Sequence, residues 1–128
     1  MFILGWIVGS NQIRNTNIFE DIKDIELLVR NAASLPMDDI WVHYESVSEY
    51  PCLSILINGV LACVHYFESS ELMWQSKGDY DTEIIFSAGG EEWCAPTDTI
   101  ISIESAIKCL YEFCSNMKRP ECIQWQEL

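Results

Sequence analysis

Two histidines and several cysteines are the residues of this sequence with the side chains that most often bind metals or act as nucleophiles. Cys63 and His65 are two positions apart, so on a strand their side chains point to the same face. His43 could join them from a neighbouring strand, which makes three possible ligands. The sequence has no Cys-x-x-Cys, no His-Glu-x-x-His and no fourth ligand at a typical spacing. We therefore predict no metal site and assign these side chains to packing.

A cysteine–histidine nucleophile is the second chemistry that these residue types suggest. Its reactive form is a thiolate, which needs electropositive surroundings. The sequence has 20 Asp and Glu against seven Lys and Arg, a formal net charge of −13, and such a surplus of carboxylates raises cysteine pKa values. Most cysteines lie in apolar runs, where cysteine behaves as a small hydrophobic residue. We interpret all six as free core thiols: Cys52, Cys63, Cys94, Cys109, Cys114 and Cys122.

Paired carboxylates and a glycine pair are the remaining candidates for catalysis. Glu91-Glu92 and Asp79/Asp81 place acids near one another, but adjacent residues of a strand point to opposite faces, and nothing positions a pair across a cleft. Gly89-Gly90 lacks the surrounding motif of a phosphate-binding loop, and the two glutamates that follow it would repel phosphate. We predict a turn there, and we predict that the protein is not an enzyme and has no cofactor.

A binding role is the alternative, and one segment of the sequence suits it. Between residues 68 and 93 the sequence mixes acids with aromatic residues, and protein interfaces favour aromatic anchors surrounded by polar groups. Trp74 and Trp93 fit a core position equally well, so the sequence leaves that alternative open. The predicted partner-binding residues are Glu68, Glu71, Trp74, Asp79, Tyr80, Asp81, Glu91 and Glu92.

The elements that hold these residues begin with an apolar run at residues 1–8, which we interpret as a buried strand. The run is too short to cross a bilayer and has no basic region before it, unlike a signal peptide, so we place the protein in the cytoplasm. Residues 9–17 are polar and predict a loop. A helix capped by Asp21 and ended by Pro36 follows. Its apolar stripe consists of Ile22, Ile25, Leu28, Val29 and Ala32.

The middle of the chain predicts strands at residues 40–44, 53–57 and 60–67, because these runs are rich in aromatic and β-branched residues. Asn58-Gly59 separates the last two runs, and Asn-Gly between apolar segments is a strong hairpin signal. Residues 60–67 are apolar at both alternating sets of positions. We therefore expect a central strand, with one face on the helices and the other partly covered.

The chain after this hairpin predicts a continuing antiparallel meander. Strands are expected at residues 71–75 and 83–86, joined by a polar stretch at residues 76–79, with a further short strand around Trp93. Ser102 is a good N-cap for a second helix, and residues 122–125 are expected to return as an edge strand. The predicted fold class is α+β: an antiparallel β-sheet, a meander with an Asn-Gly hairpin, packed by two main α-helices.

Length and composition restrict the class of partner. The 128 residues are 49% apolar and 12% aromatic, which suits one compact domain over residues 1–128 with a real core. A net charge of −13 repels nucleic acid and anionic lipid and attracts a cationic protein surface. The same charge could also serve only to keep the protein soluble. We expect a basic protein partner, no direct nucleic acid and no membrane.

An ordered set of short motifs runs from Val60 to the end of the chain. After the strand at residues 60–67 come Trp74-x-Ser76-x-Gly78, Phe86-x-x-Gly89-Gly90, a helix ending in Phe113, Arg119-Pro120 and Ile123-x-Trp125-x-Glu127-Leu128. In order and spacing this set resembles a family of bacterial polymorphic-toxin immunity proteins. Within that group it is similar to the immunity protein of a double-stranded-DNA cytosine deaminase toxin.

The resemblance implies a small α+β domain that is made beside a secreted toxin and binds it, so that the toxin's active site cannot reach its substrate. It implies no cofactor and no catalytic residue. Our hypothesis is that the acids occupy the basic nucleic-acid groove of the toxin, while the motif glycines and Arg119-Pro120 set turns and Trp125 packs in the core. The alternatives are immunity to a nuclease toxin, an acidic nucleic-acid mimic that inhibits a cellular DNA-binding protein, and a small enzyme.

Overall fold

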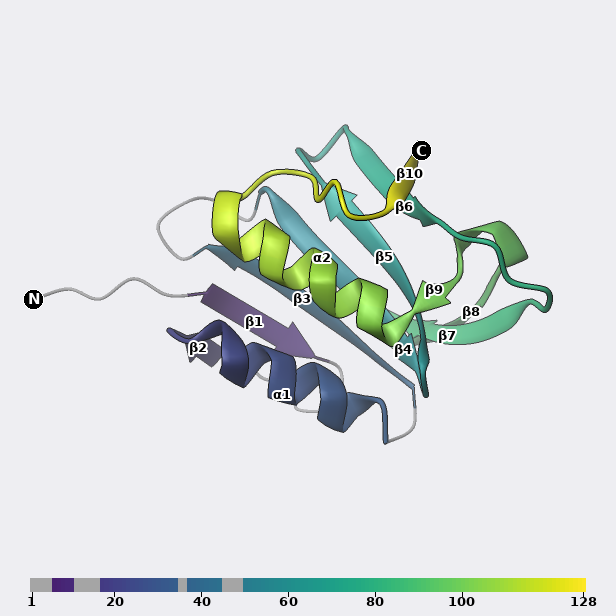
Figure 1. Cartoon of the computed structure of the whole chain (residues 1–128), viewed down its shortest axis with the longest axis horizontal. Helices are drawn as coiled ribbons and strands as arrows, with labels where there is room; N and C mark the ends of the chain where they lie inside the picture. The colour runs from purple at the N-terminus through teal and green to yellow at the C-terminus, as the bar shows by residue number, and fades with distance from the viewer. Residues whose placement is uncertain (1–5, 11–16, 35–36, 45–49) are drawn as a thin grey trace, which may run out of the picture.

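The computed structural model describes residues 6–10, 17–34, 37–44 and 50–128, and in them the chain forms an antiparallel sheet with both described helices on one face (Figure 1). All neighbouring strands of the sheet are antiparallel. The predicted fold class is therefore confirmed. The strand order is β10 (Gln124–Glu127), β6 (Met73–Lys77), β5 (Leu61–Phe67), β4 (Cys52–Asn58), β3 (Asp38–Tyr44), β1 (Trp6–Ser10) and β2 (Asn17–Phe19), and β9 (Ile101–Ser102) pairs with β5.

The predicted Asn-Gly hairpin joins β4 to β5. Asn58 pairs with Leu61, so the two turn residues are Gly59 and Val60, one position later than predicted. Gly59 has φ +62°, and a glycine with positive φ at the first central position is typical of a two-residue hairpin turn. β5 is central in the sheet, as predicted, because it lies between β4 and β6.

The two helices begin at the predicted caps. The Asp21 carboxylate accepts the backbone N–H of Lys23 at the start of α1 (Ile22–Ala32), and the Ser102 hydroxyl accepts that of Ser105 at the start of α2 (Ile103–Asn116). Such caps satisfy backbone donors that have no partner in the helix. Neither described helix is both long and apolar enough to cross a membrane.

We call the side of the sheet under the helices the first face. Its core joins the apolar stripes of α1 and α2 to alternate residues of β3, β4 and β5. Burial of these side chains is the main stabilising term of the fold. The largest side chains that are fully buried there are Phe113, Ile25, Ile40, Leu53, Ile55, Ile57 and Leu110.

The prediction that the meander continues beyond β6 is wrong. β7 (Ile84–Ala88) and β8 (Glu91–Ala95) pair only with each other among the described strands, and β6 pairs with β10 instead. The β7–β8 hairpin lies on the second face of the sheet, where Phe86 and Ala95 pack on Leu56 and Cys63 in a smaller core of their own. This packing explains why β5 is apolar on both faces.

Several predicted boundaries are also corrected. β6 begins two residues later than expected, at Met73, and β7 begins at Ile84. Residues 9 and 10 belong to β1 rather than to a loop, and Asn17 begins β2, a strand that was not predicted. Residues 1–5 of the expected opening strand, most of the expected loop and Pro36 lie outside the described residues.

Candidate partner-binding surface

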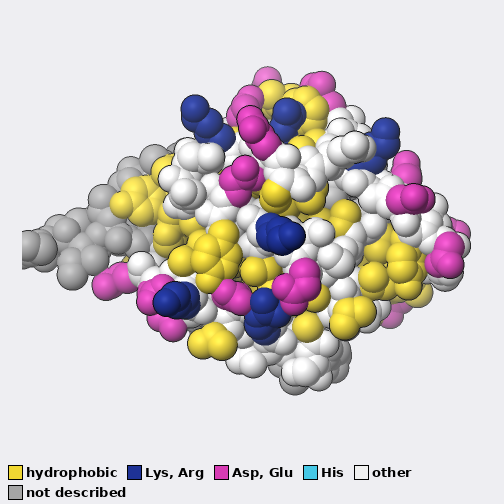
Figure 2. Space-filling view, in the orientation of Figure 1, with side chains coloured by type: hydrophobic (Ala, Val, Ile, Leu, Met, Phe, Trp, Pro, Cys, Tyr) yellow, Lys and Arg dark blue, Asp and Glu magenta, His cyan; other side chains and the backbone are white. Residues whose placement is uncertain are grey.

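The predicted acidic residues are exposed but do not form one patch. Glu68 and Glu71 lie in the turn between β5 and β6, whereas Asp79 and Asp81 follow β6 at its other end. The five residues of β6 separate the two groups by roughly 17 Å, at about 3.4 Å per residue. Glu91 and Glu92 form a third group at the start of β8. On the helix-bearing face, Figure 2 likewise shows Asp and Glu side chains at several separate places.

One part of the molecule is nevertheless uniformly acidic. Between Lys77 and Lys108 the chain contains seven Asp and Glu and no Lys or Arg. We call residues 78–95 the acidic lobe: the β7–β8 hairpin with the loop before it. The Asn58 amide donates to the carbonyl of Ile85 at 2.8 Å, and the Gly89 N–H donates to the Asp39 carboxylate at 3.0 Å, which fixes the lobe at two points.

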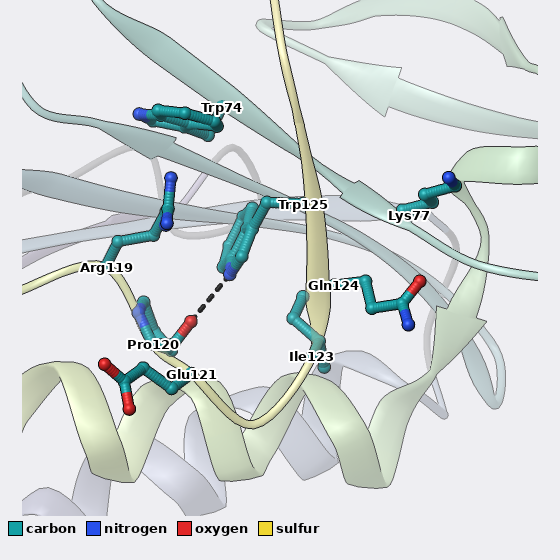
Figure 3. Close-up of a pocket in the computed structure, with 8 residues that line it drawn as sticks. All are labelled: Trp74, Lys77, Arg119, Pro120, Glu121, Ile123, Gln124 and Trp125. Carbon is teal, nitrogen blue, oxygen red and sulfur yellow. Dashed lines mark hydrogen bonds between the residues drawn. The ribbon is translucent and has the colours of Figure 1, made fainter.

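Trp74 lies apart from the acids, in a hollow of about 420 Å³ between β6, β10 and the segment that follows α2 (Figure 3). The Arg119 guanidinium lies 4.0 Å from the centre of the Trp74 ring, within cation–π range. The Trp125 indole N–H donates to the carbonyl of Pro120 at 2.6 Å. Lys77 also lines the hollow. Trp74 therefore packs against a cation, and the acid that lines the same hollow is Glu121, which was not among the predicted partner-binding residues.

The other motif residues fix contacts between strands or form turns. The Ser76 hydroxyl accepts the N–H of Val64 at 3.0 Å and donates to the carbonyl of Thr99 at 2.7 Å. A Cβ atom on Gly78 would come within 1.8 Å of the Ile100 carbonyl oxygen, so only glycine fits there. Gly89 and Gly90 have positive φ in the hairpin turn, and Trp125 packs against the core, both as expected.

The second face carries a surface beside the acidic lobe that no other described residue covers, and the sequence reasoning missed it. One cavity of about 400 Å³ lies where the lobe meets the sheet, and a second of about 220 Å³ lies next to it. Phe67 lines both, so the two cavities are adjacent. We call this surface the aromatic shelf; its lining residues are Trp41, His43, Tyr50, Cys52, Ser54, His65, Phe67, Met73 and Trp93.

His65 lies at the centre of the shelf, 6.0 Å from the Trp93 ring and 6.2 Å from the Phe67 ring. Burial lowers the pKa of His65 to about 4, since a charged ring would lose its hydration. The amide nitrogen of Gln75 lies 3.0 Å from Nε2 of His65, and an amide nitrogen only donates. His65 is therefore a neutral acceptor at this atom. In the described residues, Nδ1 of His43 is buried without a hydrogen-bond partner.

The histidines and cysteines do not assemble as a ligand set. β4 separates His43 on β3 from Cys63 and His65 on β5, and the described residues hold no group of three potential metal ligands. Burial raises the pKa of Cys63 to about 11 and that of Cys114 to about 12. The predicted direction is right, but burial rather than the carboxylate surplus is the main cause.

All six cysteines are free thiols, but the expectation that they lie in the core holds only in part. Cys63 and Cys109 are buried. Cys94 and Cys122 are exposed, because Cys94 points outward from β8 and Cys122 lies in the segment before β10. Cys94 donates to the Glu83 carboxylate at 3.6 Å.

An α+β domain with an acidic lobe beside an uncovered aromatic sheet face has the build of a protein-binding domain. The chain belongs to the Imm1 immunity protein family, whose model, described as immunity protein Imm1, matches residues 26–127. No curated protein matches the chain. The resemblance to immunity proteins is thus confirmed at the level of the family, and membership implies a cognate toxin as the partner.

Proposed function

We propose that this immunity protein binds its cognate bacterial toxin domain in the cytoplasm and blocks the toxin's active site, and that the toxin is a deaminase acting on nucleic acid. The observation that carries the proposal is the match to the Imm1 family, which spans most of the chain including both faces of the sheet. The net charge of −13 supports the choice of target, because an enzyme that acts on nucleic acid presents a basic groove.

In this proposal the exposed carboxylates take the place of phosphates. The acidic lobe supplies Asp79, Asp81, Glu91 and Glu92, with no Lys or Arg to weaken its field. Glu68 and Glu71 at the far end of β6 add to the attraction at longer range. This long-range electrostatic attraction raises the rate at which the two proteins associate, and salt weakens it. Neutralisation of a toxin inside the cell needs nanomolar affinity or better, on the order of −12 kcal/mol.

Co-expression tests this function. The toxin encoded beside the gene is induced in a sensitive bacterial host with and without this protein, and survival is counted. We expect the protein to restore growth. Normal killing in its presence, with both proteins detected, would overturn the proposal.

A charge-reversal pair then tests the role of the lobe. Glu91→Lys with Glu92→Lys is compared with Glu20→Lys with Glu127→Lys, which makes the same change of net charge at exposed positions elsewhere. We expect the first pair to slow association with the toxin much more than the second. Equal effects would mean that only the total charge matters. Protection against a nuclease but not a deaminase would reassign the toxin's chemistry.

A further inference from the structure

The aromatic shelf is an unusual surface for this chain because large apolar side chains lie there without a cover from the described residues. Trp41, Phe67, Met73 and Trp93 are only partly buried, whereas the corresponding side chains of the first face lie under α1 and α2. Partly exposed apolar side chains gathered in this way on a folded domain typically mark a contact site.

Two aromatic side chains of the shelf are held in place by packing. A Cβ atom on Gly9 would lie 2.2 Å from the Trp41 ring, so this indole packs directly on the backbone of β1. Trp93 packs against the smaller core of the lobe, and the Asp39–Gly89 hydrogen bond ties the hairpin turn to β3. A surface with its aromatic groups already fixed loses little conformational entropy when a partner binds.

The charges around the shelf indicate what kind of partner fits. Among the described residues, no Lys or Arg lines either cavity, while the Asp39 carboxylate lies at the wall. Glu91 lies two residues before Trp93 on β8, hence on the same side of the hairpin. A second copy of this chain is a poor occupant, because each copy carries −13. A segment with an apolar centre and cationic flanks complements both the apolar lining of the shelf and the acids beside it.

We propose that the aromatic shelf is the docking surface for the toxin, and that it takes a toxin segment with an apolar or aromatic anchor flanked by Lys or Arg. The anchor lies over Phe67 and between Trp41 and Trp93, and the cations lie against the acidic lobe. This proposal rests on the proposed function and adds to it the face that makes contact.

The test measures the dissociation constant of the purified toxin domain for the full chain and its variants. Phe67→Ser and Met73→Lys change the shelf, while Val60→Ser and Leu27→Ser change side chains that are 72% and 57% exposed outside the shelf and the acidic lobe. Loss of a hot-spot contact weakens binding by about 30-fold or more. We expect that loss for both shelf variants and less than about a twofold change for both controls. Circular dichroism confirms that each variant is folded.

Met73→Glu is the matched variant for the charge of the occupant. It has nearly the length of Met73→Lys with the opposite charge, so a cationic segment tolerates the glutamate better than the lysine. Equal weakening of toxin binding by the two variants would contradict the proposal that the docked segment has cationic flanks. Tight toxin binding by folded Phe67→Ser and Met73→Lys would contradict the proposal that the shelf is the docking surface, and it would leave the proposed function unaffected. Failure of the unchanged chain to bind the toxin would overturn both.

Discussion

The two faces of the sheet are closed in different ways. α1 and α2 cover the first face, and the core beneath them extends from Val8 on β1 to Tyr66 on β5. The hairpin covers only part of the second face, with five buried side chains in its core, and leaves the aromatic shelf beside it. On the first face the helices cover the apolar strand residues, whereas on the second face the described residues leave part of the apolar strand surface open. A partner can bind to this open apolar surface.

The largest effect is expected from Phe113→Ala on the first face. Phe113 is fully buried and lies 5.9 Å from the Trp6 ring and 6.2 Å from the Tyr66 ring. Its removal should lower the free energy of unfolding by about 4 kcal/mol, measured by urea denaturation. Lys108→Ala, exposed on the same helix, is the control and should change little. A small loss for Phe113→Ala would mean that the first face is loosely packed.

Phe86→Ala tests whether the lobe is a separate unit. Phe86 is fully buried in the smaller core, where fewer neighbours lose contact, so we expect a loss of about 3 kcal/mol. The lobe should open without the rest of the sheet. Hydrogen exchange should then speed up in β7 and β8 and stay slow in β4 and β5. Faster exchange in all four strands would show that the two faces unfold together.

His65 gives the second face a pH dependence. The folded ring takes up a proton near pH 4, whereas the unfolded ring does so near its ordinary pKa of 6.5. The unfolded state therefore binds more protons in this window, and stability falls as the pH falls through it. The loss should reach about 2 kcal/mol near pH 5. His65→Phe, which cannot titrate, should lack this part of the slope; an unchanged slope would contradict a buried neutral ring.

The smallest effect is expected from the ion pairs on the outer side of the helices. Arg30 bonds to the half-buried Glu26 at 2.6 Å and to the exposed Glu104 at 2.8 Å. Hydrogen bonds from Tyr111 and Arg30 lower the pKa of Glu26, and the hydrogen bond from Arg30 lowers the pKa of Glu104. Exposed pairs add little to stability. Glu104→Gln should barely shift the thermal midpoint, and the shift should vanish in high salt. A shift as large as that of Phe86→Ala would contradict this ranking.

Most of the first face could be predicted from the sequence because local signals determine it. Asp21 and Ser102 identify the helix starts, Asn58-Gly59 identifies the central hairpin, and helical spacing identifies the buried stripes. These signals depend on residues close in sequence. β2 was missed for another reason: it has only three residues and directly follows the polar run that predicted a loop.

The second face could not be predicted in the same way. Whether β7 extends the sheet or folds over it depends on contacts between Phe86 and residues such as Leu56 and Cys63, which periodicity alone does not reveal. The acids were recognised, but their separation by β6 follows from topology. One signal was present: Trp41, Cys63 and Phe67 are large or apolar at the strand positions that face away from the helices.

The most direct test of the central claim, that the toxin contacts the second face, is hydroxyl-radical footprinting of the complex read by mass spectrometry. This method reports the solvent access of each side chain and so separates the two faces of one strand. We predict that toxin binding protects Trp41, Phe67 and Met73, while Leu27 on α1 and Tyr111 on α2 stay as reactive as in the free protein. Protection of Leu27 and Tyr111 with an unprotected shelf would contradict the account.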